Sequence, residues 1–308
     1  MRAVVVSQWG GPEVLTEVEA DRPEPGLNEI LVRVHAAGVN PVDWKTRASG
    51  AALIAWGEVP MVGWDVSGTV EAVGPGVTLY REGDEVYGMP NFPRQAGGYA
   101  EYVVAPTRHF ARKPASLDHV QAAALPLAAL TAWQALVDTA GVTAGQRVLI
   151  HAAAGGVGHL AVQIAKARGA YVIGTASAAK HELLRELGAD EVLDYRTTDF
   201  EDAVSDVDVV IDAVGGDYAQ RSLKVLKPGG HLVTLPGPDG IPADTQGVHA
   251  SWVLVEPDLK GLEEIAALAD QGLLKPLVDT VLPLEQAAKA HEIGELGRTT
   301  GKIVLTVG

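Results

Sequence analysis

The chain has 308 residues, enough for two domains, and its 47% hydrophobic and 20% charged residues are ordinary for a globular protein. It contains no apolar run of the roughly 18 residues that span a membrane, and its N-terminus lacks the long apolar core of a signal peptide. We therefore expect a cytoplasmic protein. Because the net charge is −15 and no long basic cluster occurs, we also expect it to bind neither nucleic acid nor membranes.

The sequence contains no cysteine. This excludes disulfide bonds, zinc sites built on thiolates and a cysteine nucleophile.

The first 110 or so residues predict short strands that are separated by glycine and proline. The expected strands are residues 2–7, 29–37, 68–73, 85–88 and 99–104. Strands of this length with frequent turn signals are typical of a small barrel or sandwich.

After residue 116 the composition becomes rich in alanine and leucine, and residues 117–140 are mostly helical in character. Apolar runs then alternate with helical stretches. The expected strands are residues 147–150, 171–175, 207–211 and 231–234, and the expected helices are 157–168, 178–187 and 219–225. This alternation predicts a doubly wound parallel sheet, whose strands are continuously apolar because helices cover both faces. A helix over 259–270, a segment over 276–282, a final helix and a strand over 302–307 follow, and we expect this last strand to return to the first domain.

The most informative segment is RVLIHAAAGGVG, which ends at Gly158 and carries a buried strand into a glycine-rich turn and a helix. Such glycines let the backbone approach a pyrophosphate, whose charge the amides at the helix N-terminus bind. Only the last two positions of the G-x-G-x-x-G pattern are met, because Ala153 stands at the first. The residues expected to hold the pyrophosphate are Ala154, Gly155, Gly156, Val157 and Gly158.

The end of the second strand indicates which dinucleotide binds. An acidic residue at this position contacts the ribose 2′-hydroxyl of NAD, but no Asp or Glu occurs in the segment from Thr175 to Lys180. Ser177 and Lys180 suit a 2′-phosphate instead, and Tyr195 would add a phenolic donor from the end of the next strand. Thr175, at the end of the second strand, is also expected to contact the cofactor. The sequence therefore favours NADPH.

Two further strand ends are expected to border the cofactor, because ligands bind at the carboxyl ends of parallel strands. Val214 and Gly215 follow the third apolar strand and would lie near the ribose. Leu235 and Pro236 follow the fourth and would flank the nicotinamide carboxamide. We interpret His151, His159 and His181 as packing or surface residues, because they show no ligand spacing.

Five further motifs are AGVNPVDWK over 37–45, GWDVSG over 63–68, AGGYAEY over 96–102, LTAW over 130–133 and GKIVL over 301–305. Together with the motifs above, they resemble the quinone oxidoreductase (zeta-crystallin-like) and enone reductase branch of the medium-chain dehydrogenases. The likeness runs over nearly the whole length. It implies a GroES-like β-barrel catalytic domain, a Rossmann domain and a homodimer. The expected domains are 1–118 for the first part of the GroES-like domain, 119–256 for the Rossmann domain and 257–308 for the return segment.

The resemblance also implies roles for individual residues. Asn40 would contact either the nicotinamide or the substrate oxygen, unless it only forms a turn before Pro41. Lys45 would stabilise an enolate or guide a proton, or is simply exposed, and Asp43 is catalytic or bonds a backbone turn. Thr131 resembles the threonine that contacts the cofactor in the family, unless it is only a buried helix residue. We also expect Gly301 and Lys302 to contact the cofactor.

Zinc-using relatives have a cysteine near the position of Asn40 and a His-Glu pair near the positions of Trp64 and Asp65. Because this chain lacks those zinc ligands, the resemblance indicates a metal-free site. Without a Lewis acid, an unactivated alcohol is hard to deprotonate. An electron-poor conjugated acceptor is easier to reduce without a metal, since NADPH supplies the hydride. We therefore expect reduction of a small apolar quinone, enone or alkenal, although the tyrosines that follow this motif in many quinone reductases are missing. An accessory enoyl reductase of polyketide or fatty-acyl metabolism and a non-catalytic NADPH-binding sensor stay open. Trp9, Trp44, Trp56 and Trp64 either line a pocket for a planar substrate or pack in the core.

Overall fold

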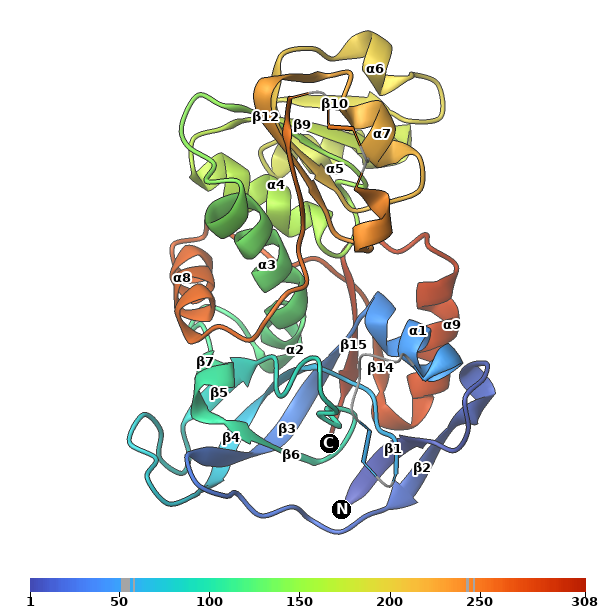
Figure 1. The fold of residues 1–308 in the computed structure, drawn as a ribbon. Helices are drawn as coiled ribbons and strands as arrows, with labels where there is room; N and C mark the ends of the chain where they lie inside the picture. The colour runs from blue at the N-terminus through green and yellow to red at the C-terminus, as the bar shows by residue number, and fades with distance from the viewer. Residues whose placement is uncertain (51–55, 58, 242–243, 246) are drawn as a thin grey trace. The chain divides into compact units, whose positions relative to one another are not determined.

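The computed structural model describes the chain except residues 51–55, 58, 242–243 and 246 (Figure 1). It divides into two compact units. The first comprises Met1–Leu130, Glu256–Gly272 and Pro276–Gly308, and the second comprises Thr131–Val255 and Leu273–Lys275. The first unit extends beyond residue 118 because helix α2 (His119–Ala123) packs its Ala123 against Ala36 and Val304 of that unit.

The second unit is built on a six-stranded parallel sheet, which confirms the doubly wound Rossmann-like architecture. Its strand order is β10-β9-β8-β11-β12-β13. The strands are β8 (Arg147–Ile150), β9 (Tyr171–Ala176), β10 (Glu191–Asp194), β11 (Val207–Asp212), β12 (Leu226–Thr234) and β13 (His249–Trp252). The order reverses between β8 and β11, so the carboxyl ends of β8, β9, β11 and β12 are where this fold class binds ligands.

Helices cover this sheet on both faces, and Figure 1 shows α4 and α7 on opposite sides of it. The helical segments are the π-helix η3 (Gln134–Thr139), α4 (Gly158–Ala167), η4 (Ala178–Lys180), α5 (His181–Glu186), α6 (Phe200–Ala203), α7 (Tyr218–Ser222) and η5 (Pro238–Gly240). Leu149, Ile173 and Val210 of three adjacent strands are buried in one cluster with Phe200 and Leu223. This apolar core fixes the strand ends from which the site is built.

The first unit is organised around the long strand β3 (Glu29–Val39). A seven-stranded sheet has the order β14-β15-β3-β4-β5-β7, with β6 also paired to β3, and β1 and β2 form a separate hairpin. The other strands are β1 (Arg2–Val6), β2 (Leu15–Glu19), β4 (Asp65–Val73), β5 (Glu85–Gly88), β6 (Tyr102–Pro106), β7 (Phe110–Arg112), β14 (Val278–Pro283) and β15 (Lys302–Thr306). Because β15 lies antiparallel to β3, the C-terminal segment completes this sheet.

The helical segments of this unit are η1 (Pro12–Val14), α1 (Pro41–Ser49), η2 (Thr107–His109), α2, α3 (Pro126–Trp133, which continues into the second unit), α8 (Leu259–Asp270), η6 (Leu284–Gln286) and α9 (Ala287–Glu295). Helix α1 was not expected among the strands of this region. It forms because Asn40 and Asp43 make a capping box, in which Asp43 Oδ2 accepts from Asn40 N, and because Pro41 occupies the first helical turn.

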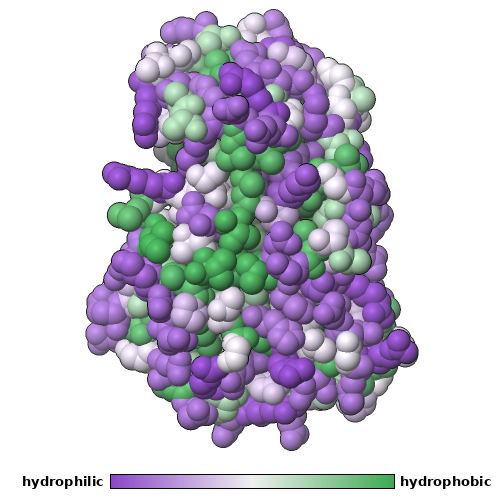
Figure 2. Space-filling view, turned by 180° about the vertical axis from the view of Figure 1, so that it is seen from behind, coloured by the Kyte–Doolittle hydropathy of each residue, from purple (hydrophilic) through white to green (hydrophobic). Residues whose placement is uncertain are grey.

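Among the described residues no helix is long and apolar enough to cross a membrane. Hydrophilic side chains cover most of the face shown in Figure 2, with hydrophobic residues gathered in patches.

Candidate functional site

The first group of candidate residues lies where three neighbouring strands of the first unit begin or end. Asn40 directly follows β3, Asp65 begins β4 and Lys302 begins β15. The strand register pairs Gly38 with Asp65 and Val39 with Ile303, so the three side chains come from the same end of adjacent strands. Each is at most 3% exposed.

Hydrogen bonds within this group fix the orientation of the Asn40 amide. Lysine can only donate and a carboxylate can only accept. Lys302 Nζ donates to Asn40 Oδ1 and, at 3.2 Å, to Asp65 Oδ2. Asn40 Nδ2 donates to Asp65 Oδ2 at 2.8 Å, and the other oxygen, Oδ1, accepts from Leu127 N at 2.6 Å. The oxygen of the amide must therefore face Lys302, and its nitrogen must face Asp65.

Asp43 lies beside this group but serves mainly the backbone. Its Oδ2 accepts from Asn40 N at 2.6 Å, and its Oδ1 accepts from Gly63 N at 2.9 Å. Burial raises its pKa to about 7, against the effect of these two hydrogen bonds, and the nearby Asp65 adds to the rise. Asp43 therefore holds the turn that presents Asn40.

A second buried polar group in this unit was missed by the sequence. Arg47 donates to Gly10 O at 3.1 Å and to His291 Nδ1 at 3.3 Å, and it pairs with Glu295. His291 Nε2 lies 3.2 Å from the Tyr99 hydroxyl. Burial, assisted by Arg47, lowers the pKa of His291 to about 3, so the imidazole is neutral. The group joins α1 to α9.

The glycine turn in the second unit leads directly into α4. Among the described residues, the backbone N–H groups of Gly156 and Val157 have no acceptor within the protein. Two open donors at the N-terminus of a ten-residue helix suit an anion. A Cβ at Gly158 would lie 2.3 Å from Ala152 O, so only glycine lets the helix approach the strand this closely.

The end of β9 carries the residues expected to recognise a 2′-phosphate. Thr175 is buried, Ser177 and Lys180 are half-buried and Tyr195 is exposed after β10. The structure adds Asp194, whose carboxylate accepts from Ala178 N at 3.2 Å. No local sequence pattern connects this acid, the last residue of β10, with the segment after β9.

The ends of β11 and β12 lie side by side, since Asp212 is in register with Thr234. Asp212 Oδ1 accepts from Val214 N and Gly215 N, both at 2.9 Å, and so shapes the loop predicted to border the ribose. Asp212 Oδ2 and Thr234 Oγ1 are buried without a partner among the described residues.

A Cβ at Gly215 would lie 3.2 Å from the Pro236 ring, so these two predicted loops adjoin. Leu235 is half-buried, and its backbone N–H donates to Asp212 O at 2.9 Å. Asp212 Oδ2 and Thr234 Oγ1, which lack a partner among the described residues, and the free backbone N–H groups of the glycine turn together fit a polar, phosphate-bearing ligand at this edge of the sheet.

The remaining predicted residues have varied positions. Lys45 is exposed on α1 and does not join the buried group, whereas Thr131 is buried in α3. Gly301 has a φ of 77°, and its position in the turn before β15 favours glycine. Of the tryptophans, Trp64 is fully buried and Trp9 is 42% exposed. The ring centroid of Trp56 lies 6.4 Å from that of Trp64 and 5.2 Å from that of Trp9.

Comparison with known proteins shows two matching families. Residues 26–115 match the alcohol dehydrogenase GroES-like domain, and residues 187–305 match a family described as zinc-binding dehydrogenase. No group of three or more His, Cys, Asp or Glu that could hold a metal occurs within the residues that the structure describes.

Individual relatives match over the whole chain. A 2-methylene-furan-3-one reductase of Solanum lycopersicum is 36% identical over 99% of this chain and 79% of its own. A solved quinone oxidoreductase from Coxiella burnetii is 38% identical, covers 100% of this chain and 99% of its own, and has a TM-score of 0.92. A mycobacterial protein solved in complex with NADPH is 32% identical over 100% of both chains, with a TM-score of 0.88.

Proposed function

Because the chain belongs to the quinone oxidoreductase and enone reductase branch of the medium-chain dehydrogenase/reductase superfamily, we propose that it is an NADPH-dependent reductase that acts on a conjugated acceptor without zinc. The observation that carries this proposal is the fixed amide of Asn40. Family membership supports an oxidoreductase that uses a nicotinamide cofactor. The choice of NADPH and of the acceptor rests on the residues of the two units.

The second unit supplies the groups that would hold the dinucleotide. The open N–H groups of Gly156 and Val157 would bind the pyrophosphate, and Ser177 and Lys180 would bind the 2′-phosphate. A 32% identical relative with the same fold binds NADPH, which supports this assignment. Asp194 brings a negative charge close to the segment after β9. For this reason NADH has to be compared directly with NADPH.

The first unit supplies a hydrogen-bond donor for the acceptor's oxygen. Only one hydrogen of Asn40 Nδ2 is used, in the bond to Asp65, and the described residues offer no acceptor for the second. An amide held in this way gains most when it donates to an oxygen that becomes negatively charged. The Lys302 ammonium polarises the amide through Asn40 Oδ1 and adds a positive charge near the site.

These groups suit the reduction of a quinone, enone or alkenal. The bound cofactor would supply the hydride, and solvent would supply the proton that completes the reduction. In a conjugated acceptor the charge that develops lies on the carbonyl oxygen, where the Asn40 donor and the positive charge of Lys302 stabilise it. Oxidation of an unactivated alcohol would instead need a Lewis acid or a strong base. The site offers a buried, neutral amide, which favours the first reaction.

The test is NADPH consumption by the purified protein, with NADH in parallel, against a panel of quinones, enones and alkenals. We expect turnover with NADPH at a lower KM than with NADH. The preferred acceptor then distinguishes quinone from enone chemistry. NADPH binding without turnover on any of these would favour an enoyl-thioester substrate or a non-catalytic sensor, and binding of neither nucleotide would contradict the proposal.

We also propose that the chain works as a homodimer. Among the described strands, β13 pairs only with β12 and so forms an edge of the parallel sheet, where a second copy could continue the pairing. Light scattering during gel filtration should give twice the 32.2 kDa mass of one chain, and a single-chain mass at micromolar concentration would contradict this.

A further inference from the structure

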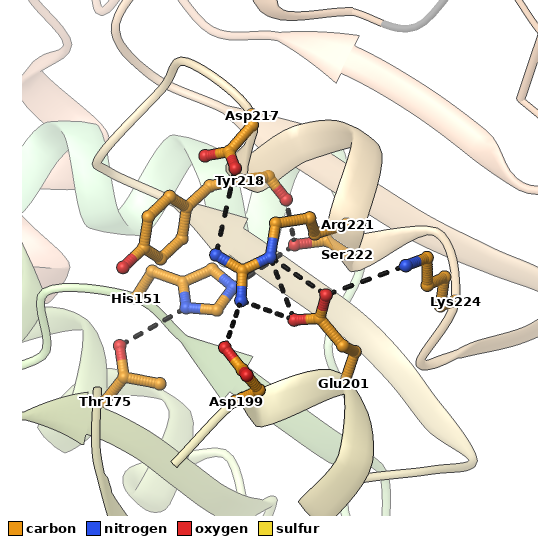
Figure 3. Close-up of polar contacts among 9 residues, drawn as sticks. All are labelled: His151, Thr175, Asp199, Glu201, Asp217, Tyr218, Arg221, Ser222 and Lys224. Carbon is orange, nitrogen blue, oxygen red and sulfur yellow. Dashed lines mark hydrogen bonds and ion pairs between the residues drawn. The ribbon is translucent and has the colours of Figure 1, made fainter. Parts of the chain in front are cut away.

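His151 is a buried titratable residue that the proposed reaction does not use. It directly follows β8 and opens the glycine turn, and its side chain is fully buried. Both ring nitrogens have partners: Nδ1 lies 3.2 Å from Thr175 Oγ1, and Nε2 lies 3.2 Å from Ser222 Oγ (Figure 3). The sequence indicated a packing residue, but two hydroxyls aimed at one imidazole indicate a more specific role.

The direction of every hydrogen bond in this group can be assigned. Ser222 Oγ donates to Tyr218 O at 2.7 Å, so its lone pair accepts from His151 Nε2–H. A neutral imidazole has one N–H, which makes Nδ1 an acceptor for the Thr175 hydroxyl. Thr175 Oγ1 in turn accepts from Ala152 N at 3.3 Å. The chain of bonds therefore runs from Ala152 through Thr175 and His151 to Ser222 and the backbone of α7.

The surroundings keep the ring neutral and in place. Phe200 and Tyr218 contact it edge-on, with ring centroids 4.5 and 4.9 Å away. Arg221 lies over both aromatic rings and is held by Glu201 through a bidentate pair with hydrogen bonds of 2.6 to 3.0 Å (Figure 3). Burial, and then the positive charge of Arg221, lower the pKa of His151 to about 3.

This chain of bonds ties together three segments that the proposed function assigns to the dinucleotide. Ala152 begins the glycine turn and has a φ of 50°, a conformation that a residue with a side chain rarely adopts. Thr175 stands two residues before Ser177 at the end of β9. Ser222 anchors α7, which follows the loop containing Val214 and Gly215. His151 lies between these segments and links all of them.

We propose that His151 is a positioning residue for dinucleotide binding: through Thr175 it holds the Ala152 turn and the end of β9, and through Ser222 it holds the segment after β11. This inference rests on the proposed function. The ring of His151 is fully buried and both of its nitrogens have protein partners, so we expect it to affect the affinity for NADPH and not the chemical step.

The test compares His151→Phe with His151→Asn. Phenylalanine keeps the ring contacts with Phe200 and Tyr218 but loses both hydrogen bonds. Asparagine offers an oxygen near the position of Nδ1, which can accept from Thr175. We expect His151→Phe to raise the Kd for NADPH, measured by calorimetry, at least about tenfold and to raise its KM, with kcat at saturating NADPH nearly unchanged. His151→Asn should recover much of the affinity.

Two further variants separate positioning from stability. Val225→Ala makes a cavity in the same core, where Val225 is 1% exposed, and should lower Tm without changing the Kd. Thr175→Val removes the hydroxyl at nearly constant shape, so it tests the same link even if His151→Phe fails to fold. The double variant His151→Phe/Thr175→Val should have a Kd for NADPH no higher than that of whichever single variant binds less tightly.

The outcomes distinguish the two proposals. Wild-type protein that binds neither NADPH nor NADH overturns the proposed function, and this inference with it. Wild-type protein that binds NADPH, together with His151→Phe and Thr175→Val variants of unchanged Kd, overturns the inference alone. A Kd that rises equally in Val225→Ala would also overturn it, because the effect would then be one of stability.

Discussion

The Asn40 amide illustrates how neighbouring charges can settle a chemical role. An amide side chain can usually present either its oxygen or its nitrogen to a ligand. Here the ammonium of Lys302 and the carboxylate of Asp65 select one orientation, and both are buried. Such a pair contributes little net stability, since burying two charges costs about as much as their attraction returns. Its value lies in turning Asn40 into a donor.

Because Lys302 and Asp65 hold Asn40 in one orientation, substituting either of them should affect both stability and turnover. Lys302→Met leaves the Asp65 carboxylate buried without its cation and should lower the free energy of unfolding by about 3–5 kcal/mol. Adding Asp65→Asn removes the stranded charge and should recover part of this loss. The new amide would donate to Asn40 Oδ1 and reverse the Asn40 amide, so turnover should stay low although the protein is folded. Urea unfolding checks the expected change in stability, and kcat measured on the same samples checks the expected loss of turnover.

A matched control is Lys289→Met. Lys289 also pairs with a carboxylate, Glu292, at 2.9 Å, but its side chain is 60% exposed. Its loss should change stability by less than about 1 kcal/mol and leave turnover intact. A double variant that regains both stability and normal turnover would show that the orientation of Asn40 does not matter.

At the scale of elements, the junction of β8 and α4 depends on close backbone packing. We predict that Gly158→Ala is disruptive, because the new Cβ would lie 2.3 Å from Ala152 O and 2.7 Å from Ala153 Cα, both backbone atoms. At Gly155 the single close atom is Ala152 O at 3.2 Å, which a small shift relieves. Gly158→Ala should therefore lower Tm by several degrees more than Gly155→Ala does and should weaken NADPH binding. Equal Tm values for the two variants would contradict this reading.

The same junction shows what the sequence could predict and what it could not. The apolar strand, the glycine turn and the apolar stripe of the following helix are patterns within a short stretch of sequence. The parallel sheet and its strand-end residues were therefore predictable. Helix α1 was missed because its capping box is short and lies among strand signals. The pairing of Lys302 with Asp65 spans 237 residues and follows from the register of β15, β3 and β4, which no local pattern specifies. His151 was underestimated for the same reason, since Ser222 lies 71 residues away.

In the molecule as a whole, histidines with lowered pKa values dominate the expected change in stability between about pH 7 and pH 5. Burial is the leading cause of a lowered pKa at six of the nine histidines, namely His35, His109, His119, His151, His231 and His291. The pKa of each is lower in the folded state than in the unfolded chain, so unfolding below about pH 6.5 takes up protons. Their contribution to stability is therefore present above that pH and is lost as the pH falls.

Asp43 acts in the opposite direction. Burial raises its pKa to about 7, so the folded state keeps a proton that the unfolded chain releases near its ordinary value of 3.8. The stability from this group is present at low pH and is lost as the pH rises through about 7. One such group against six histidines leaves a net loss of stability on acidification.

We therefore predict that the free energy of unfolding falls as the pH is lowered from about 7 to about 5. His151→Asn removes one buried titrating group and should make this decline shallower, by up to about 1.4 kcal/mol per pH unit. Asp43→Asn removes the opposing group and should make it steeper. Urea unfolding followed by circular dichroism at several pH values measures all three slopes. If the two units unfold separately, the two changes should fall in different transitions, because His151 belongs to the second unit and Asp43 to the first. A wild-type stability that rises on acidification over this range would show that burial does not lower the pKa values of these histidines.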